Sequence, residues 1–192
     1  MHQEKTKHLQ DLLSSKFKQQ IVVSKIDLGD LVVEIQRESV GEFFKRLKED
    51  PDLTFNMLTD VTAVDWLDKK SNRFEVVYHL RSFEHGYFVR VKVALPESDP
   101  TIDSVLPYWH AADFLESEVW DMYGINFRNN PDIRRMMMYE EFEGHPLRKD
   151  YPVQGKQPRI EMRYPEVRNT AKDMVRHTLV QINKSDRAGG AA

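Results

Sequence analysis

Two pairs of carboxylates in one predicted helix are the residues of this chain that come closest to a catalytic or metal-binding pattern. Within the segment 111–123, Glu118 and Asp121 share one face, and Asp113 and Glu116 share another. Paired carboxylates can act as general acid and base or can bind a hard cation. No nucleophile or base stands near them in the sequence, whereas arginines do, so the pattern favours ion pairs over catalysis. These arginines are Arg128, Arg134, Arg135 and Arg148.

A rigid, charged block follows this helix. Gly144 is expected to take an unusual φ angle, and Pro146 and Pro152 restrict the residues before them to extended backbone. Between Gly124 and Gly155 the chain has five basic and five acidic residues, so it is locally neutral. This balance predicts mutual pairing or a mixed-charge interface with a protein, and not the capture of a phosphate.

The chain has no cysteine and seven histidines. The absence of cysteine excludes disulfides, thiol nucleophiles, Cys-ligated zinc and an iron–sulfur cluster held by this chain's own thiolates. None of the histidines lies in a metal-ligand motif. His145, between Gly144 and Pro146, has a special setting, and we expect it to fix that turn by hydrogen bonding. A metal site formed by Glu118, Asp121 and His145 is the enzymatic alternative.

Hydrophobic periodicity predicts the helices that position these residues. A helical stripe covers residues 4–18, and Ser39 with Glu42 is a capping box that opens a second helix. Thr101 is expected to cap a short helical turn. The segment 111–123 is the last predicted helix, and Gly124 ends it as a C-cap.

Alternating and β-branched runs predict two hairpins and a further strand. Together with the helices they predict an α+β domain over 1–124, with a mostly antiparallel sheet and helices on one face. An extended, largely irregular arm is expected over 125–192, with a disordered end. Within it, Met136–Tyr139 fits a buried strand and a partner-docking segment equally well. The expected strands cover 20–26, 31–35, 57–66, 73–81 and 87–95.

The composition fits a soluble globular protein of the cytoplasmic type. The 192 residues are 40% hydrophobic and 31% charged, and the formal net charge of −3 gives no general attraction to nucleic acid or anionic lipid. No apolar run approaches the ~20 residues that span a bilayer. The polar, Lys-rich segment Met1–Gln20 is not a secretory signal.

The same helix and block resemble a known family. Glu116-x-Glu118-x-x-Asp121-Met-Tyr-Gly124, then Asn130-Pro-Asp-Ile-Arg134-Arg135, then Gly144-His145-Pro146-Leu-Arg148-Lys149-Asp150-Tyr151-Pro look like the signature of the C subunit of NADH-quinone oxidoreductase, the thirty-kilodalton subunit of respiratory complex I. The similarity covers about 116–153. The chain departs from the family's usual pattern at Ser117, where arginine is common, and at Asn130, where histidine is common.

The resemblance implies a structural and assembly subunit without catalytic residues, in the peripheral arm of a proton-pumping complex. It implies that this chain binds no cofactor, while the whole enzyme uses NADH, FMN, iron–sulfur clusters and quinone. It implies two partners, the D-type subunit at the quinone site and the B-type subunit that bears a cluster, and a peripheral position on the cytoplasmic face of the bacterial inner membrane. The expected partner-interface and signature residues are Glu116, Glu118, Asp121, Gly124, Arg134, Arg135, Gly144, His145, Pro146, Arg148, Lys149, Asp150 and Tyr151.

Two alternatives accompany this interpretation. The first keeps the module but places it in a membrane-bound hydrogenase or another donor-dependent quinone reductase. The second is the free-standing metal-dependent enzyme described above. An adaptor unrelated to respiration is disfavoured by the length of the motif.

Overall fold

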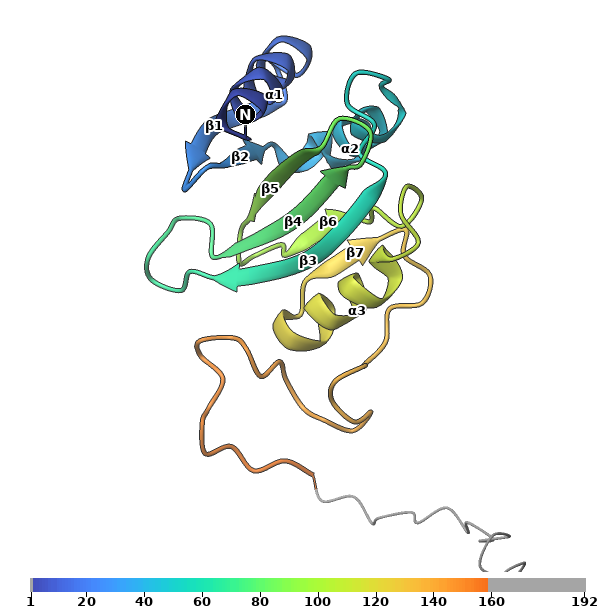
Figure 1. Cartoon of the computed structure of the whole chain (residues 1–192). Coiled ribbons are helices and arrows are strands. Elements are labelled where there is room, and N and C mark those ends of the chain that lie inside the picture. Colours follow the sequence, from blue (N-terminus) through green and yellow to red (C-terminus); the bar gives the residue numbers. More distant parts are fainter. Residues whose placement is uncertain (1, 159–192) are drawn as a thin grey trace, which may run out of the picture. The chain divides into compact units, whose positions relative to one another are not determined.

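The computed structural model describes residues 2–158. Within them a five-stranded sheet of order β1-β2-β5-β4-β3 forms the centre, and a second pair of strands, β6 and β7, flanks α3 (Figure 1). The main sheet consists of β1 (Ile21–Asp27), β2 (Asp30–Ile35), β3 (Met57–Asp65), β4 (Phe74–Ser82) and β5 (Tyr87–Leu95). The other elements are α1 (His2–Lys16), the 3-10 turn η1 (Arg37–Ser39), α2 (Val40–Glu49), β6 (Thr101–Asp103), α3 (Ala112–Tyr123) and β7 (Asn126–Arg128).

Two antiparallel hairpins form most of the sheet, as the alternating runs predict. Asp27 pairs with Asp30 at the tip of the first hairpin, and Ser82 pairs with Tyr87 in the second. β3 adds to β4 in antiparallel orientation, whereas β2 and β5 run parallel where the two hairpins meet. The prediction of a mostly antiparallel α+β sheet is therefore confirmed.

One hydrophobic core lies between the sheet and the helices. Alternate residues of β4, from Phe74 to Leu80, point into it because successive side chains of a strand face opposite sides. The ring of Phe44 lies 4.7 Å from that of Tyr78 and 5.9 Å from that of Trp109. Every helix contributes to this core, so the helices cover one face of the sheet, as predicted. Their core side chains include Leu9 and Leu13 of α1, Phe43 and Phe44 of α2, and Ala112 and Val119 of α3.

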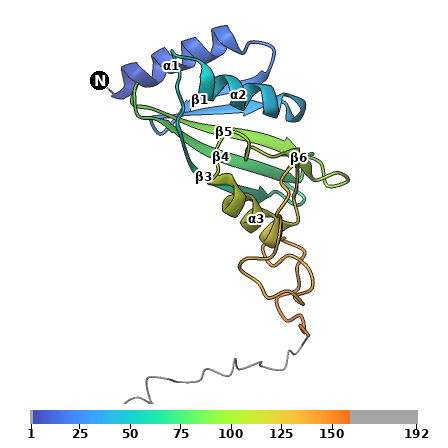
Figure 2. The ribbon, with the colours of Figure 1, turned by 90° about the vertical axis from the view of Figure 1, so that its right-hand side faces the viewer.

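The two ends of the sheet carry different helices. α1 packs against β1, β2 and β5, whereas α3 packs against β3 (Figure 2). Gly124 ends α3 with a φ of +72°, as predicted, and β7 then pairs in parallel with β6. The residues that follow, 129–158, contain no helix or strand and are called the strap below.

The predicted domain limit at residue 124 stays a prediction. Residues 2–158 belong to one compact unit, and this unit includes the strap. The remainder of the predicted arm, 159–192, with its expected disordered end, lies outside the described residues.

Three local predictions are wrong. Ser39 makes no side-chain capping bond to α2, because it already lies in the helical region at φ −93°, ψ −3°. Thr101 begins strand β6 and caps no helical turn. Met136–Tyr139 is irregular backbone and not a buried strand, since the Met137 side chain is 61% exposed.

Replacing Ser39 by alanine tests the first of these corrections. An N-cap serine is worth about 1 kcal/mol to a helix. Because the Ser39 hydroxyl does not cap α2, we expect Ser39→Ala to change the free energy of unfolding by less than about 0.5 kcal/mol in denaturant titrations. Ser104→Ala serves as the control, since Ser104 Oγ donates a 2.7 Å bond to a buried carboxylate and its loss is expected to cost about 1–2 kcal/mol.

Candidate functional site

The strap is held to the domain by polar contacts. None of its described side chains is buried, so a hydrophobic core of its own does not hold it. Four sets of hydrogen bonds replace that core. They centre on Glu116, Asp121, the C-terminal end of α3, and Arg73.

Glu116 fixes the beginning of the strap. Its carboxylate is fully buried and accepts hydrogen bonds from Ser104 Oγ at 2.7 Å, the Val105 amide at 2.8 Å and Asn130 Nδ2 at 2.9 Å. Asn130 Oδ1 in turn accepts from the Asp132 amide at 3.1 Å, which closes a turn. Burial raises the pKa of Glu116 because its three hydrogen bonds do not outweigh desolvation. Asn130 is thus a structural link between α3 and the strap.

Asp121 is the second anchor. Its Oδ2 accepts the amides of Met136, Met137 and Met138 at 3.0, 2.8 and 2.9 Å, and its Oδ1 lies 2.6 Å from Arg135 Nη1. Three successive amides around one carboxylate form a nest for an anion. Burial alone would raise the pKa of Asp121, but the Met138 amide, Arg135 and the two other amides together lower it. The carboxylate is therefore ionised at neutral pH.

Arg135 connects this anchor to the next part of the strap. Its Nη2 donates to the carbonyls of Phe142 at 2.6 Å and Gly144 at 3.1 Å. Its guanidinium also lies 5.6 Å from the ring centre of Trp120 and 5.5 Å from that of Phe142. One cation thus joins α3 to two turns of the strap through hydrogen bonds and cation–π contacts.

The block around His145 caps the C-terminal end of α3. A helix leaves its last four carbonyls without partners inside the helix. Here the Asp121 carbonyl lies 3.0 Å from His145 Nδ1, the Met122 carbonyl accepts from the Leu147 amide at 3.1 Å, and the Tyr123 carbonyl accepts from Arg148 Nε at 2.5 Å. A carbonyl only accepts, so Nδ1 of His145 carries the proton. Half-burial lowers the pKa of His145, which keeps the ring neutral at pH 7.

Gly124 makes this cap possible. A Cβ atom at this position would lie 2.6 Å from both Arg148 Nη2 and the His145 ring. Gly144 also has a positive φ, +87°, as predicted, and a Cβ there would lie 3.0 Å from the Tyr151 ring. The two glycines therefore provide both the backbone conformation and the space that the strap needs.

Arg73 is the last anchor, and sequence analysis missed it. Its side chain is 5% exposed and forms a bidentate pair with Asp65, through Nε–Oδ1 at 3.0 Å and Nη2–Oδ2 at 2.9 Å. Asp150 of the strap binds the same guanidinium at 2.7 Å, and Glu97 binds it at 2.5 Å. The Lys149 amide donates to Asp65 at 2.8 Å. The bonds to Asp65 and Asp150 raise the pKa of Arg73.

A signal for this anchor exists in the sequence. Asp65 lies at the end of one predicted strand, and Arg73 is the first residue of the next. These two strands pair with each other, so the two residues of opposite charge lie at the same end of the pair. Such a pair across a hairpin indicates a buried ion pair. The third partner, Asp150, lies 77 residues further along, and no local pattern connects it to Arg73.

The predicted site residues have different fates. Asp121 pairs with an arginine of the strap, as expected, whereas Glu118 is exposed and forms no hydrogen bond or ion pair with any residue of 2–158. The prediction that Glu118 pairs with an arginine of the arm or of the partner finds no such arginine within residues 2–158 and otherwise stays a prediction. Arg134 pairs with Asp132 at 2.5 Å, and Tyr151 stacks 6.0 Å from Phe142. Of the other block residues, Lys149 holds the loop through its backbone amide, and Pro146 is half-buried.

The geometry of these side chains is that of attachment sites for the strap. In the part of the chain that the structure describes, no group of three His, Asp or Glu side chains is placed to hold a metal ion. The enzymatic alternative of Glu118, Asp121 and His145 therefore finds no ligand set there, because Asp121 is occupied by amides and Arg135. Among residues 2–158, no helix is long and apolar enough to cross a membrane.

Substitution of Gly124 tests the cap. Gly124→Ala is expected to lower the free energy of unfolding, because alanine disfavours φ +72° and its Cβ would collide with Arg148 and His145. Gly86→Ala is the control, since Gly86 has φ +67° with only Lys5 Nζ nearby, at 3.4 Å. In urea titrations we expect about 1 kcal/mol for the control and at least about 1 kcal/mol more for Gly124→Ala. Equal losses would contradict the cap.

Acidification tests the Asp121 anchor. Since folding lowers the pKa of Asp121, its stabilising contribution is present above the unfolded value near 3.8 and is lost as the pH falls through the folded pKa. We expect Asp121→Asn to cost about 3 kcal/mol at pH 7 and progressively less below pH 4. Asp113→Asn, on the same helix, is expected to cost less than about 1 kcal/mol at either pH. A pH-independent difference between wild type and Asp121→Asn would rule out an ionised anchor.

Comparisons with known proteins agree with this geometry. The family model described as respiratory-chain NADH dehydrogenase, 30 Kd subunit, matches residues 33–157, a range that includes nearly the whole strap. The C subunit of NADH-quinone oxidoreductase from Geobacter sulfurreducens is 44% identical over 144 residues, which are 73% of this chain and 88% of that protein. The C subunit from Paramagnetospirillum magneticum is 40% identical over 159 residues, 82% of this chain and 77% of that protein.

Two solved structures are also similar. The trypsin-resistant fragment (1–134) of Nqo5 is 31% identical with a TM-score of 0.55, and the match covers 69% of this chain and 99% of that one. A chain of the archaeal membrane-bound sulfane sulfur reductase shares the fold, with a TM-score of 0.62, 23% identity and coverage of 79% and 87%. The chain belongs to the family of the 30 Kd subunit of respiratory-chain NADH dehydrogenase.

Proposed function

We propose that this chain is a structural and assembly subunit of proton-pumping NADH-quinone oxidoreductase and carries no catalytic residue of its own. The contacts that the signature residues make within the chain support this proposal. Asp121, Arg135, His145 and Arg148 all form intramolecular contacts that hold the strap, so each uses at least one side-chain polar atom for attachment. A general acid or base would need access to a substrate proton.

The rest of the assignment follows from family membership and is part of the same proposal. The chain itself binds no cofactor, and the whole enzyme passes electrons from NADH through FMN and iron–sulfur clusters to quinone. The strap lies against the D-type subunit at the quinone site, near the B-type subunit that bears a cluster. The chain then joins the membrane through the complex alone, on the cytoplasmic face of the bacterial inner membrane.

The strap supplies the physical argument for an assembly role. It extends over 129–158 without a buried side chain, yet its backbone is held in place by hydrogen bonds to the domain. A segment with a fixed backbone and exposed side chains is ordered before it meets a partner, so association costs less conformational entropy.

Arg148 gives a direct test. Its guanidinium lies 5.2 Å from the ring centre of Phe74, and its Nε binds the Tyr123 carbonyl. We expect Arg148→Ala in the full chain, expressed with a tag in its own organism, to reduce the co-purified D-type and B-type subunits at least about fivefold, as measured by quantitative mass spectrometry. Circular dichroism of the variant is expected to retain the signal of the sheet domain.

Arg81→Ala is the matched control. Arg81 also lies over an aromatic ring, 5.5 Å from the centre of Phe88, but on β4 and outside the strap. The amount of D-type and B-type subunits that co-purifies with Arg81→Ala is expected to equal that of the wild-type chain. If hydrogenase or other donor subunits co-purify with the wild-type chain in place of NADH-oxidising ones, the assignment to NADH as donor is wrong. If no other protein of the complex co-purifies, the assembly role is wrong.

A further inference from the structure

The strap, although locally neutral, carries an exposed cluster of acidic side chains. Arg135 and Arg148 point inward, to Asp121, Trp120 and the carbonyl of Tyr123. The acidic side chains of the strap that lack an ion pair with any residue of 2–158 are exposed, and they are Glu140, Glu141 and Glu143. Asp150 also points inward, to Arg73, and Lys149 is exposed, so the observation that matters is the cluster itself: three neighbouring glutamates are exposed and unpaired with any of the residues 2–158.

Apolar side chains lie beside these acids. Met137 is 61% exposed, and Tyr139 is 38% exposed. On α3, Phe114 is 57% exposed, and the exposed Glu118 follows it by one helical turn. Large apolar side chains at such exposure, next to one another, are typical of a contact surface.

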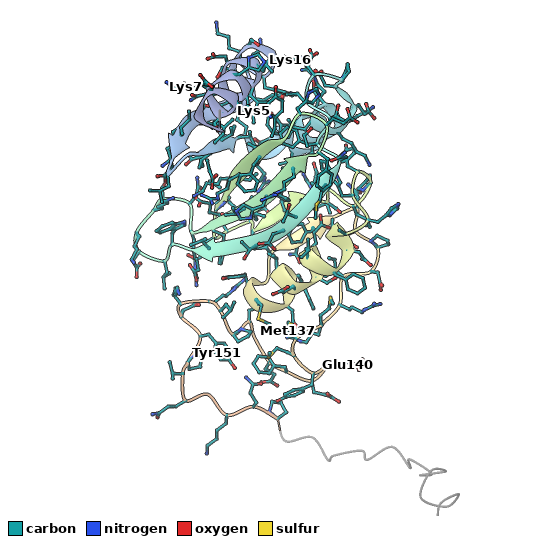
Figure 3. The ribbon with its side chains drawn as sticks, viewed as in Figure 1. Lys5, Lys7, Lys16, Met137, Glu140 and Tyr151 are labelled. Carbon is teal, nitrogen blue, oxygen red and sulfur yellow. The ribbon has the colours of Figure 1, made fainter. Side chains whose placement is uncertain are left out.

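Helical spacing and one hydrogen bond connect the exposed residues of α3 with those of the strap. Phe114, Glu118 and Asp121 lie at intervals of four and three, so they share one stripe of α3. The Met137 amide binds the Asp121 carboxylate at the end of this stripe, which brings the strap alongside it. Figure 3 shows Met137 next to α3 and Glu140 further along the strap, while the labelled lysines of α1 lie at the opposite end of the domain. We call Phe114, Glu118, Met137, Tyr139, Glu140 and Glu141 the outer face.

We propose that the outer face is the docking surface of the strap, and that its partner is a protein surface with an apolar depression bordered by lysines or arginines. This proposal rests on the assembly role given above and specifies its contact. The signature cations and carboxylates shape the strap from within, and the outer face touches the partner. Apolar residues at the centre provide affinity, and the surrounding carboxylates provide orientation and a salt-dependent association rate.

Charge complementarity determines the choice of partner. Four carboxylates in and next to the outer face, Glu118, Glu140, Glu141 and Glu143, have no cation among the described residues. A second copy of this chain would place these like charges against each other, which is unfavourable. A basic surface on another protein of the same complex neutralises them.

Two variants and two matched controls test the proposal in the full chain, in its own organism. Met137→Asp removes the apolar centre, and the double variant Glu140→Lys with Glu141→Lys reverses the charge. The controls are Val22→Asp, at a position 62% exposed on β1, and Glu84→Lys, at an exposed residue after β4. The readout is the ratio of co-purified peripheral-arm subunits to the tagged chain, measured at 50 and 300 mM NaCl. Thermal unfolding of each purified variant shows whether it is folded.

We expect Met137→Asp and the double charge variant to lower the ratio at least about fivefold, with both controls within about twofold of wild type. We also expect the wild-type ratio to fall with salt and the double charge variant to lose that dependence. Wild-type ratios for the two outer-face variants would overturn the proposal while leaving the assembly role intact. Equal losses in variants and controls would also overturn it, because the effect would not be specific to the outer face. Absence of co-purified subunits with the wild-type chain would instead reject the assembly role.

Discussion

The backbone carbonyls at the end of α3 are the constraint on which the strap depends. Gly124 stops the helix, so the carbonyls of Asp121, Met122 and Tyr123 need donors from outside it. The strap supplies all three, through an imidazole, an amide and a guanidinium. The positive donor among them also lies favourably at the negative end of the helix dipole. Removal of the strap would leave this helix end unsatisfied, so α3 and the strap form one structural element.

Buried carboxylates are a second, electrostatic reason why the domain needs the strap. Asp121 and Asp65 are buried carboxylates, and each is stabilised by one arginine and by backbone amides that the strap supplies. A buried carboxylate without such partners would cost several kcal/mol. Glu116 differs, because its partners are neutral and its pKa rises. The strap thus completes the hydrogen bonding of both carboxylates, and at Asp121 it supplies the arginine as well, which specifies the path of the strap.

Much of the domain could be predicted from the sequence, because each hairpin and helix has a local pattern. The run from Phe74 to Leu80 and the glycine after Tyr123 are examples, and both predictions are confirmed. The strap could be predicted as irregular, but its contacts could not. Asp150 reaches Arg73 across 77 residues, and no periodicity encodes that distance. The prediction for Ser39 is wrong because this residue is the last of a 3-10 turn that leads directly into α2. The prediction for Thr101 is wrong because this residue pairs with Asn126 of β7.

Attachment at Asp121 and at Arg73 encloses residues 139–149 in a loop whose two ends the protein itself holds. The entropy of closing this loop is lost when the chain folds and not when it associates. Because closure entropy depends only weakly on loop length, one or two residues inserted near Glu141 would change this entropy little. The two attachment points would keep such a lengthened loop on the same side of the domain.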